Sequence, residues 1–106
     1  MNELETIKEA KDQEDQQFNK IKNIAKEAYK LIDHKKFREA KDKFSELLTI
    51  DPNNTYGLVG MGELLYKTQK FEEAIIYYRK CLNLDPSNKF SIMGLMNCYR
   101  DLKQLN

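Results

Sequence analysis

A repeat of 34 residues restricts the fold more than any other feature of this sequence. Residues 55–88 repeat residues 21–54 with nine identical positions, eight of them within the 19 residues from 36 to 54. The pair Asp51-Pro52 returns as Asp85-Pro86. A third copy begins at Lys89 and covers about half a unit. A period of this size is typical of solenoids and arrays, in which each unit buries its apolar face against its neighbours.

Each unit predicts two helices. Apolar residues recur every three or four positions from Phe18 to Ile32, as on one face of an amphipathic helix. A second stripe runs from Phe37 to Leu48, and Asp51-Pro52 ends it because proline disfavours helix in the residue before it. Three more helices are predicted, over 55–67, 71–82 and 88–102.

The boundaries of these helices carry cap and turn residues. Asn54, and either Ser87 or Asn88, are plausible N-caps, since their side chains can accept a hydrogen bond from the first turn. The connections 33–36 and 68–70 are short and polar, so the paired helices must be antiparallel neighbours.

Small and aromatic residues occupy fixed places in both units. The stretch 71–88, FEEAIIYYRKCLNLDPSN, is close to the consensus of a known repeat, and on it residues 21–88 resemble two tetratricopeptide repeats. The family places small residues where paired helices touch and aromatic residues beside them. The small sites hold Ala28, Ala40, Gly62, Ala74 and Cys81. The aromatic sites hold Phe37, Phe44, Phe71 and Tyr78. The sequence departs from the family pattern in three ways. Leu47 stands where the family has a small residue, and Glu27 where it has an apolar one. Where the family has a large aromatic residue, this sequence has Ile24, Leu58 and Ile92.

The resemblance implies an all-α fold and an architecture. Residues 21–106 would form an α-α solenoid, a right-handed superhelix of antiparallel helix pairs, with full repeats at 21–54 and 55–88 and a half repeat at 89–106. The first helix of each pair would line a concave groove.

Residues 1–20 match no repeat and carry a net charge of −3, against +4 for the remainder. We interpret them as a polar, acidic N-terminal extension. Two forms remain open: a helical continuation of the first helix, or frayed tail, and an acidic arm or lid on the end of the stack.

Catalytic, cofactor and metal sites are not predicted. The single histidine, His34, falls in a solvated turn, where a general base would lack a fixed partner. Two cysteines and one histidine cannot supply four zinc ligands. The glycines from Gly57 to Gly62 follow no strand and lack the Gly-Lys-Ser/Thr element of a phosphate loop. We therefore expect no enzyme activity and no cofactor.

Charge and hydropathy exclude two classes of partner. The net charge of +1, and the acidic residues inside the basic cluster of Lys35, Lys36, Arg38, Lys41 and Lys43, argue against nucleic acid. No apolar run approaches the ~20 residues of a membrane span. With no export signal, Cys81 and Cys98 are predicted to be free thiols of a cytoplasmic protein.

The groove is the predicted peptide-binding site. Its residues include exposed aromatics and a methionine, which dominate binding hot spots and adaptable grooves, although part of the set could be second-layer core. Gly60 and Gly94 are expected to face the groove, so that Gly60→Ala would leave the fold intact. The residues are Tyr29, Tyr56, Val59, Gly60, Glu63, Tyr66, Phe90, Met93, Gly94, Asn97 and Arg100.

The predicted function is a protein–protein interaction module that docks an apolar or amphipathic peptide or helix, as a scaffold or adaptor. The alternative is a self-associating solenoid fragment of a larger assembly protein. Many members of the family clamp the acidic tails of chaperones with Lys, Asn and Arg. No such clamp is expected here, because the matching places hold Ala25, Tyr29, Gly60, Phe90 and Gly94.

The last predicted helix carries an apolar stripe whose partner helix is missing. It consists of Ile92, Leu95, Met96 and Tyr99. The stripe predicts a homodimer through the C-terminal helix, or contact with a binding protein or a downstream helix. The alternative is that Leu102 and Leu105 fold back over it.

Overall fold

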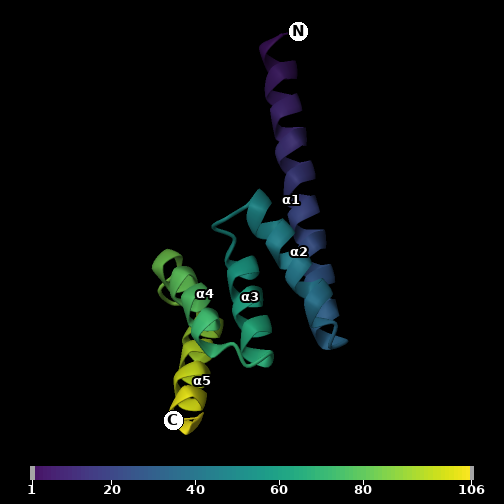
Figure 1. Cartoon of the computed structure of the whole chain (residues 1–106). Coiled ribbons are helices and arrows are strands. Elements are labelled where there is room, and N and C mark those ends of the chain that lie inside the picture. Colours follow the sequence, from purple (N-terminus) through teal and green to yellow (C-terminus); the bar gives the residue numbers. More distant parts are fainter. Residues whose placement is uncertain (1, 106) are drawn as a thin grey trace.

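Five α-helices follow one another along the chain (Figure 1). The computed structural model describes residues 2–105, with side chains from Asn2 to Gln104; Met1 and Asn106, the ends of the predicted extension and half repeat, lie outside the described residues. No strand occurs in the described range, so the all-α prediction is confirmed. The helices are α1 (Glu3–Asp33), α2 (Phe37–Ile50), α3 (Thr55–Lys67), α4 (Phe71–Leu84) and α5 (Lys89–Leu105).

The helices pack in chain order and form two layers. Each helix contacts the next one, and the first helices also contact each other, α1 with α3 and α3 with α5. Within residues 2–105, the second helices α2 and α4 do not approach one another. The stack is therefore tighter on the side of α1, α3 and α5, as expected of a helical solenoid.

The Asp-Pro-x-Asn segments separate the repeats. Asp51 and Asp85 have nearly the same non-helical backbone conformation, with φ of −137° and −140°. The side chain of Asn54 accepts a hydrogen bond from the Gly57 N–H at 2.9 Å, and that of Asn88 accepts one from the Ser91 N–H at 3.0 Å. Both predicted caps are confirmed, with Asn88 rather than Ser87 at the second.

The turns inside the repeats are also copies of each other. Lys35 and Gln69, 34 positions apart, both have a left-handed backbone with φ near 60°. The next residue then donates a backbone hydrogen bond at 2.8 Å to the last turn of the first helix, Lys36 to Leu31 and Lys70 to Leu65. This closing pattern satisfies carbonyls that the helix end would otherwise leave unpaired.

The core lies where paired helices touch. Ala28, Ala40, Ala74, Cys81 and the backbone of Gly62 are buried, as predicted for small contact sites. These small residues let the helices approach closely enough for aromatic side chains to fill the space between the layers.

Helix α1 is longer than a repeat helix and runs through residue 20 without interruption. Its start is fixed by a capping box, in which the Asn2 side chain accepts from the Glu5 N–H at 2.8 Å and the Glu5 carboxylate accepts from the Asn2 N–H. All described residues before Ile21 are exposed, and the helix projects beyond the others (Figure 1). The extension is thus a helical continuation of α1 and does not fold over the stack.

The prediction that Gly60 and Gly94 face the groove is wrong. Both are buried, and each lies against an aromatic ring of the preceding second helix. A Cβ on Gly60 would overlap the ring of Phe44, and a Cβ on Gly94 would overlap that of Tyr78. These two glycines are helix contacts that make room for the rings.

Gly60→Ala should therefore destabilise the protein. We expect a loss of about 1–3 kcal/mol in the free energy of unfolding, because displacing the Phe44 ring outweighs a gain of about 1 kcal/mol in helix propensity. Urea unfolding measures it. Gly57→Ala is the matched control, since the atoms nearest its Cβ belong to the flexible side chains of Leu47 and Leu48, at longer distances than the Phe44 ring, and it should cost less. A stabilised Gly60→Ala variant would contradict the tight ring contact.

Candidate functional site

Two adjoining hollows lie along the first helices. The first, here called the inner hollow, has a volume of about 380 Å³ and lies between α1, α3 and the start of α5. The second, here called the α1 hollow, has a volume of about 640 Å³ and follows α1 toward the extension. Tyr29 and Tyr56 line both, so together they form one continuous surface. The inner hollow is lined by Tyr29, Thr55, Tyr56, Val59, Glu63, Asp85, Asn88 and Phe90.

Tyr29 is the fixed centre of this surface. Its hydroxyl donates a hydrogen bond of 2.7 Å to the backbone carbonyl of Tyr56, which ties α1 to the first turn of α3. Its ring meets Phe44 edge to face, at 5.1 Å between centroids. Burial, with the nearby Glu63 carboxylate, raises the pKa of Tyr29. Tyr29 is thus a neutral, oriented donor at physiological pH.

The rim of the inner hollow combines apolar and acidic side chains. Tyr56 and Phe90 are 70% and 72% exposed, which is unusual for rings of this size. Glu63 and Asp85 supply negative charge beside them. The inner hollow can therefore hold an apolar group with a cationic neighbour.

On its α1 side the α1 hollow carries three lysines and one aspartate, Asp33, so the charge there is mainly positive. Phe18, Ile21 and Ala25 form its apolar floor, and lysines of the same helix stand along it. The sequence places these residues on one amphipathic stripe of the first helix, and in the structure Phe18 is exposed while Ile21 and Ala25 are half-buried. Its basic residues, Lys22, Lys26 and Lys30, recur every four positions, a spacing that places them on one side of the helix.

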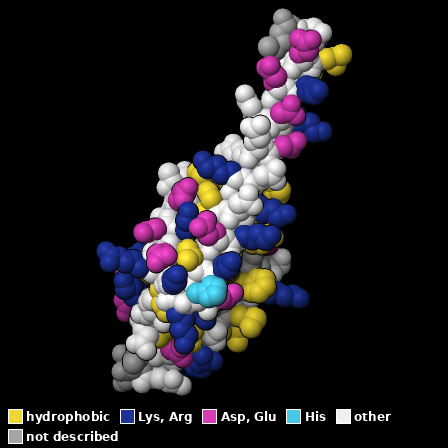
Figure 2. Space-filling view, turned by 90° about the vertical axis from the view of Figure 1, so that its right-hand side faces the viewer, with side chains coloured by type: hydrophobic (Ala, Val, Ile, Leu, Met, Phe, Trp, Pro, Cys, Tyr) yellow, Lys and Arg dark blue, Asp and Glu magenta, His cyan; other side chains and the backbone are white. Residues whose placement is uncertain are grey.

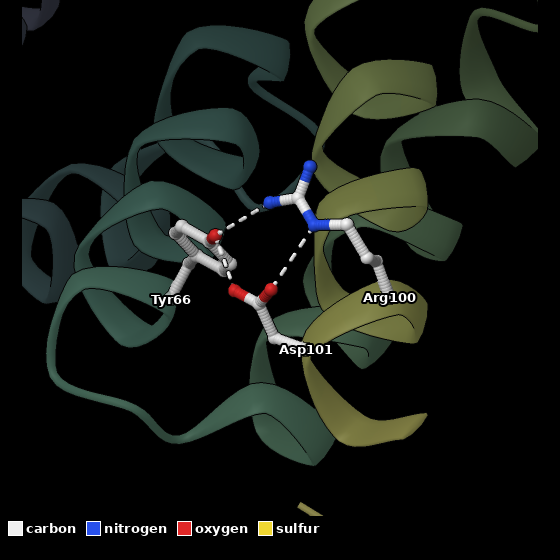
Figure 3. A network of polar contacts seen from close by, with 3 residues as sticks. All are labelled: Tyr66, Arg100 and Asp101. Carbon is white, nitrogen blue, oxygen red and sulfur yellow. Dashed lines mark hydrogen bonds and ion pairs between the residues drawn. The ribbon is translucent and has the colours of Figure 1, made fainter. Parts of the chain in front are cut away.

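A polar network joins α3 to α5 at the other end of the groove (Figure 3). The Tyr66 hydroxyl donates a hydrogen bond of 2.5 Å to Asp101, and the Arg100 Nε donates one of 3.1 Å to the same carboxylate. Arg100 also reaches the Tyr66 oxygen, at 3.4 Å. The Tyr66 hydrogen bond and the Arg100 charge lower the pKa of Asp101. Sequence reasoning missed Asp101. Through its carboxylate, Tyr66 and Arg100 belong to a polar network within the protein, here called the internal tie.

This tie should depend on pH. A lowered pKa in the folded state means that the Asp101 carboxylate stabilises the fold above its unfolded pKa of about 3.9, and that this contribution is lost as the pH falls below that value. We expect Asp101→Asn to be less stable than the unmodified protein at pH 7, with the difference shrinking toward about pH 3. Urea unfolding across this range measures it. Asp42→Asn, at an exposed position of α2, is the control and should show no such trend. A constant difference for Asp101→Asn would contradict the charged tie.

The eleven predicted groove residues do not all line the same surface. Five of the eleven, including Tyr29 and Phe90, line the inner hollow. Met93 is exposed on α5, and Asn97 is half-buried. Gly60 and Gly94 lie behind the surface, where they hold aromatic rings.

The groups with reactive side chains form no catalytic arrangement among the described residues. His34 is exposed at the C-terminus of α1, and Figure 2 shows basic and acidic side chains interspersed around the histidine. Lys43 of the basic cluster lies 3.5 Å from Glu27 and 3.8 Å from Glu46. Cys81 and Cys98 are free and buried, and burial raises the pKa of Cys98 to about 11. No group of three or more metal-ligating side chains occurs within the described part of the chain.

Comparison with known proteins agrees with the helix arrangement. Residues 55–88, which span α3 and α4, match the sequence profile of the tetratricopeptide repeat family. Residues 55–88 are a tetratricopeptide repeat. The family prediction is confirmed for residues 55–88, and all five helices are consistent with such repeats. Tetratricopeptide repeats generally serve as protein–protein interaction modules and are typically non-catalytic. No curated protein matches the sequence of this chain. None of the helices described for this repeat protein is both long and apolar enough to cross a membrane.

Proposed function

We propose that this protein is an adaptor that docks an apolar or amphipathic peptide across the inner hollow. The observation that carries the proposal is the exposure of Tyr56, Phe90 and Met93 along one side of the first helices. These residues lie beside the inner hollow, which Tyr29 also lines. Aromatic rings and methionine in such a position are typical of protein-binding hot spots. No reaction is proposed, since the hollow contains no nucleophile paired with a base.

The charges of the two hollows suggest the chemistry of the ligand. An apolar side chain in the inner hollow would place a neighbouring basic group near Glu63 and Asp85. A peptide that continues into the α1 hollow would meet Lys22 and Lys26, which favour acidic residues. The ligand is therefore an amphipathic segment with basic residues at one end and acidic residues at the other. The two buried free thiols support a cytoplasmic location, where cysteines stay reduced.

Acidic chaperone tails should not be ligands. Clamp binding needs several cationic or amide donors at the centre of the groove. Here Gly60 and Gly94 are buried under rings, Ala25 and Phe90 carry no charge, and Glu63 would repel the tail. Titration calorimetry with such a peptide should give no measurable heat of binding.

The docking proposal can be tested by selecting ligands from a randomised peptide library displayed on phage. Phe90→Asp should weaken binding of the selected peptides at least about tenfold, because it puts a charge where an apolar contact forms. Its effect on stability should be small, since Phe90 is exposed. Ile76→Asp, at an exposed apolar position of α4 outside both hollows, is the matched control and should bind as the unmodified protein does. Peptides that bind equally to Phe90→Asp would show that the inner hollow is not the site.

A homodimer through α5 is the second candidate. On α5, Ile92, Met96 and Tyr99 are exposed and Leu95 is half-buried, although Arg79 donates a hydrogen bond to the Tyr99 hydroxyl. Leu102 packs against the core, as Leu95 does, and the side chain of Leu105 lies outside the described residues. The counterparts of Ile92, Leu95 and Tyr99 in the preceding repeat are all buried: Leu58, Met61 and Leu65.

The comparison between repeats favours a helix on this face. In the preceding repeat α4 covers the equivalent face of α3, so α5 lacks the cover that the same positions have there. In a two-fold antiparallel pair, Ile92 would meet Tyr99 of the second copy and Leu95 would meet Met96, which leaves apolar groups on both sides.

The α5 homodimer predicts a mass of two chains in solution. Met96→Glu should return it to one chain, because a charge would enter the centre of the pair, while changing the free energy of unfolding by less than about 0.5 kcal/mol at this exposed position. Sedimentation equilibrium measures the mass. Equal masses for Met96→Glu and the unmodified protein would contradict this candidate.

A further inference from the structure

The N-terminal half of α1 is a helix without cover. The apolar side chains of Leu4, Ile7 and Phe18 are 78%, 58% and 67% exposed. Figure 1 shows this part of the helix standing clear of the other four. The stability of a helix in a protein normally comes from packing one apolar face rather than from intrinsic helix propensity. The exposed apolar side chains therefore indicate a partner for the projecting segment.

The spacing of side chains along this segment is that of a coiled coil. Positions 4, 7, 11, 14, 18 and 21 are separated alternately by three and four residues, and they are apolar at both ends. The two central positions are charged, with opposite signs. The series continues onto the floor of the α1 hollow, which Phe18 and Ile21 line. Such a stripe is the seam along which two helices pack. Its members are Leu4, Ile7, Lys11, Glu14, Phe18 and Ile21.

We propose that this segment pairs with the same segment of a second copy of this chain, antiparallel and about a two-fold axis between Lys11 and Glu14. In an antiparallel pair the stripe is complementary to itself, because its apolar positions then face apolar positions and its basic position faces its acidic one. In this register Leu4 meets Ile21 of the second copy and Ile7 meets Phe18. Lys11 of each chain meets Glu14 of the other, so both charged layers contain an ion pair. This goes beyond the docking proposal and uses neither Tyr56 nor Phe90.

The flanking charges agree with the same register. Lys8 and Asp15 lie beside the seam on the same edge of the helix, and in the antiparallel pair Lys8 of one chain approaches Asp15 of the other. A parallel pair in register would instead place Lys11 against Lys11 and Glu14 against Glu14. Like charges at a seam are unfavourable, so the charge pattern selects the antiparallel orientation.

The fold leaves room for this partner. In the proposed register the second copy's helix begins opposite Ile21, so it reaches the edge of the α1 hollow without entering the repeats. The helix pairs of the two copies then lie at opposite ends of the shared segment. Because the seam spans only about two and a half heptads and contains two charged layers, the association should be weak.

Charge reversal tests the pairing with the full chain. Sedimentation equilibrium from about 10 μM to about 1 mM should show a monomer–dimer equilibrium. Lys11→Glu and Glu14→Lys should each raise the dissociation constant at least about tenfold, because each puts like charges in both central layers. An equimolar mixture of the two variants should dimerise again, since every layer then pairs opposite charges. Thermal unfolding should be unchanged, because both positions are exposed.

One control variant separates this interface from the rest of the helix surface. Glu9→Lys changes the charge on the opposite side of the segment and should leave the dissociation constant unchanged. A chain that stays monomeric up to about 1 mM would overturn the proposal. So would a mixture of Lys11→Glu and Glu14→Lys that associates no better than either variant alone.

Cysteine crosslinking tests the orientation. Mixed Ile7→Cys and Phe18→Cys chains should form a disulfide on oxidation, because these positions share a layer. Neither variant alone should do so, since equal positions are about 16 Å apart along the pair. The native thiols of Cys81 and Cys98 are buried and stay out of the reaction. Crosslinking of Ile7→Cys with itself would show a parallel pair and overturn the antiparallel register.

Discussion

The structure depends on the insertion of one aromatic ring from each second helix between two first helices. Tyr78 of α4 packs against the backbones of Gly62 in α3 and Gly94 in α5. Phe44 of α2 does the same one repeat earlier, where it packs against Gly60 and meets Tyr29 of α1 edge to face. Each ring fills space that only a residue without a side chain leaves open, and so fixes the separation of neighbouring first helices.

The ring contacts also determine where the groove lies. They bring α1, α3 and α5 into one layer, and polar ties then connect neighbouring helices of that layer at each end. Tyr29 bonds to the backbone of Tyr56 between α1 and α3, and Tyr66 bonds to Asp101 between α3 and α5. Because the core takes the rings of the second helices, aromatic side chains on the outer turns of the first helices, such as Phe90, remain exposed. Binding capacity is therefore a consequence of how the layers are spaced.

Two faces of the described helices have no helix packed on them. On α5 it is the stripe around Met96, whose counterpart on α3 is covered by α4. On α1 it is the groove side, which the extension prolongs to Leu4. Lys11 and Glu14 interrupt the α1 face with charges of opposite sign. These charges favour one direction of a second helix packed on it, which a wholly apolar stripe would not. Specific pairing needs such polar positions, because apolar contact alone permits several registers.

The amino-acid sequence by itself determined the local structure of this protein. The 34-residue period, the Asp-Pro-x-Asn segments and the apolar stripes predict all five helices, the Asn54 cap, a second cap at Ser87 or Asn88, and the small contact sites, since helix ends and contact faces depend on a few neighbouring residues. Only the tertiary structure decided which face of each helix meets which neighbour. A helix turns by about 100° per residue, so residues such as Gly60 and Val59 point to different surroundings, and the packing angle assigns one to a ring and the other to the groove. The same reason explains why Asp101, the α1 hollow and the open face of Phe18 appear only when the helices are placed together.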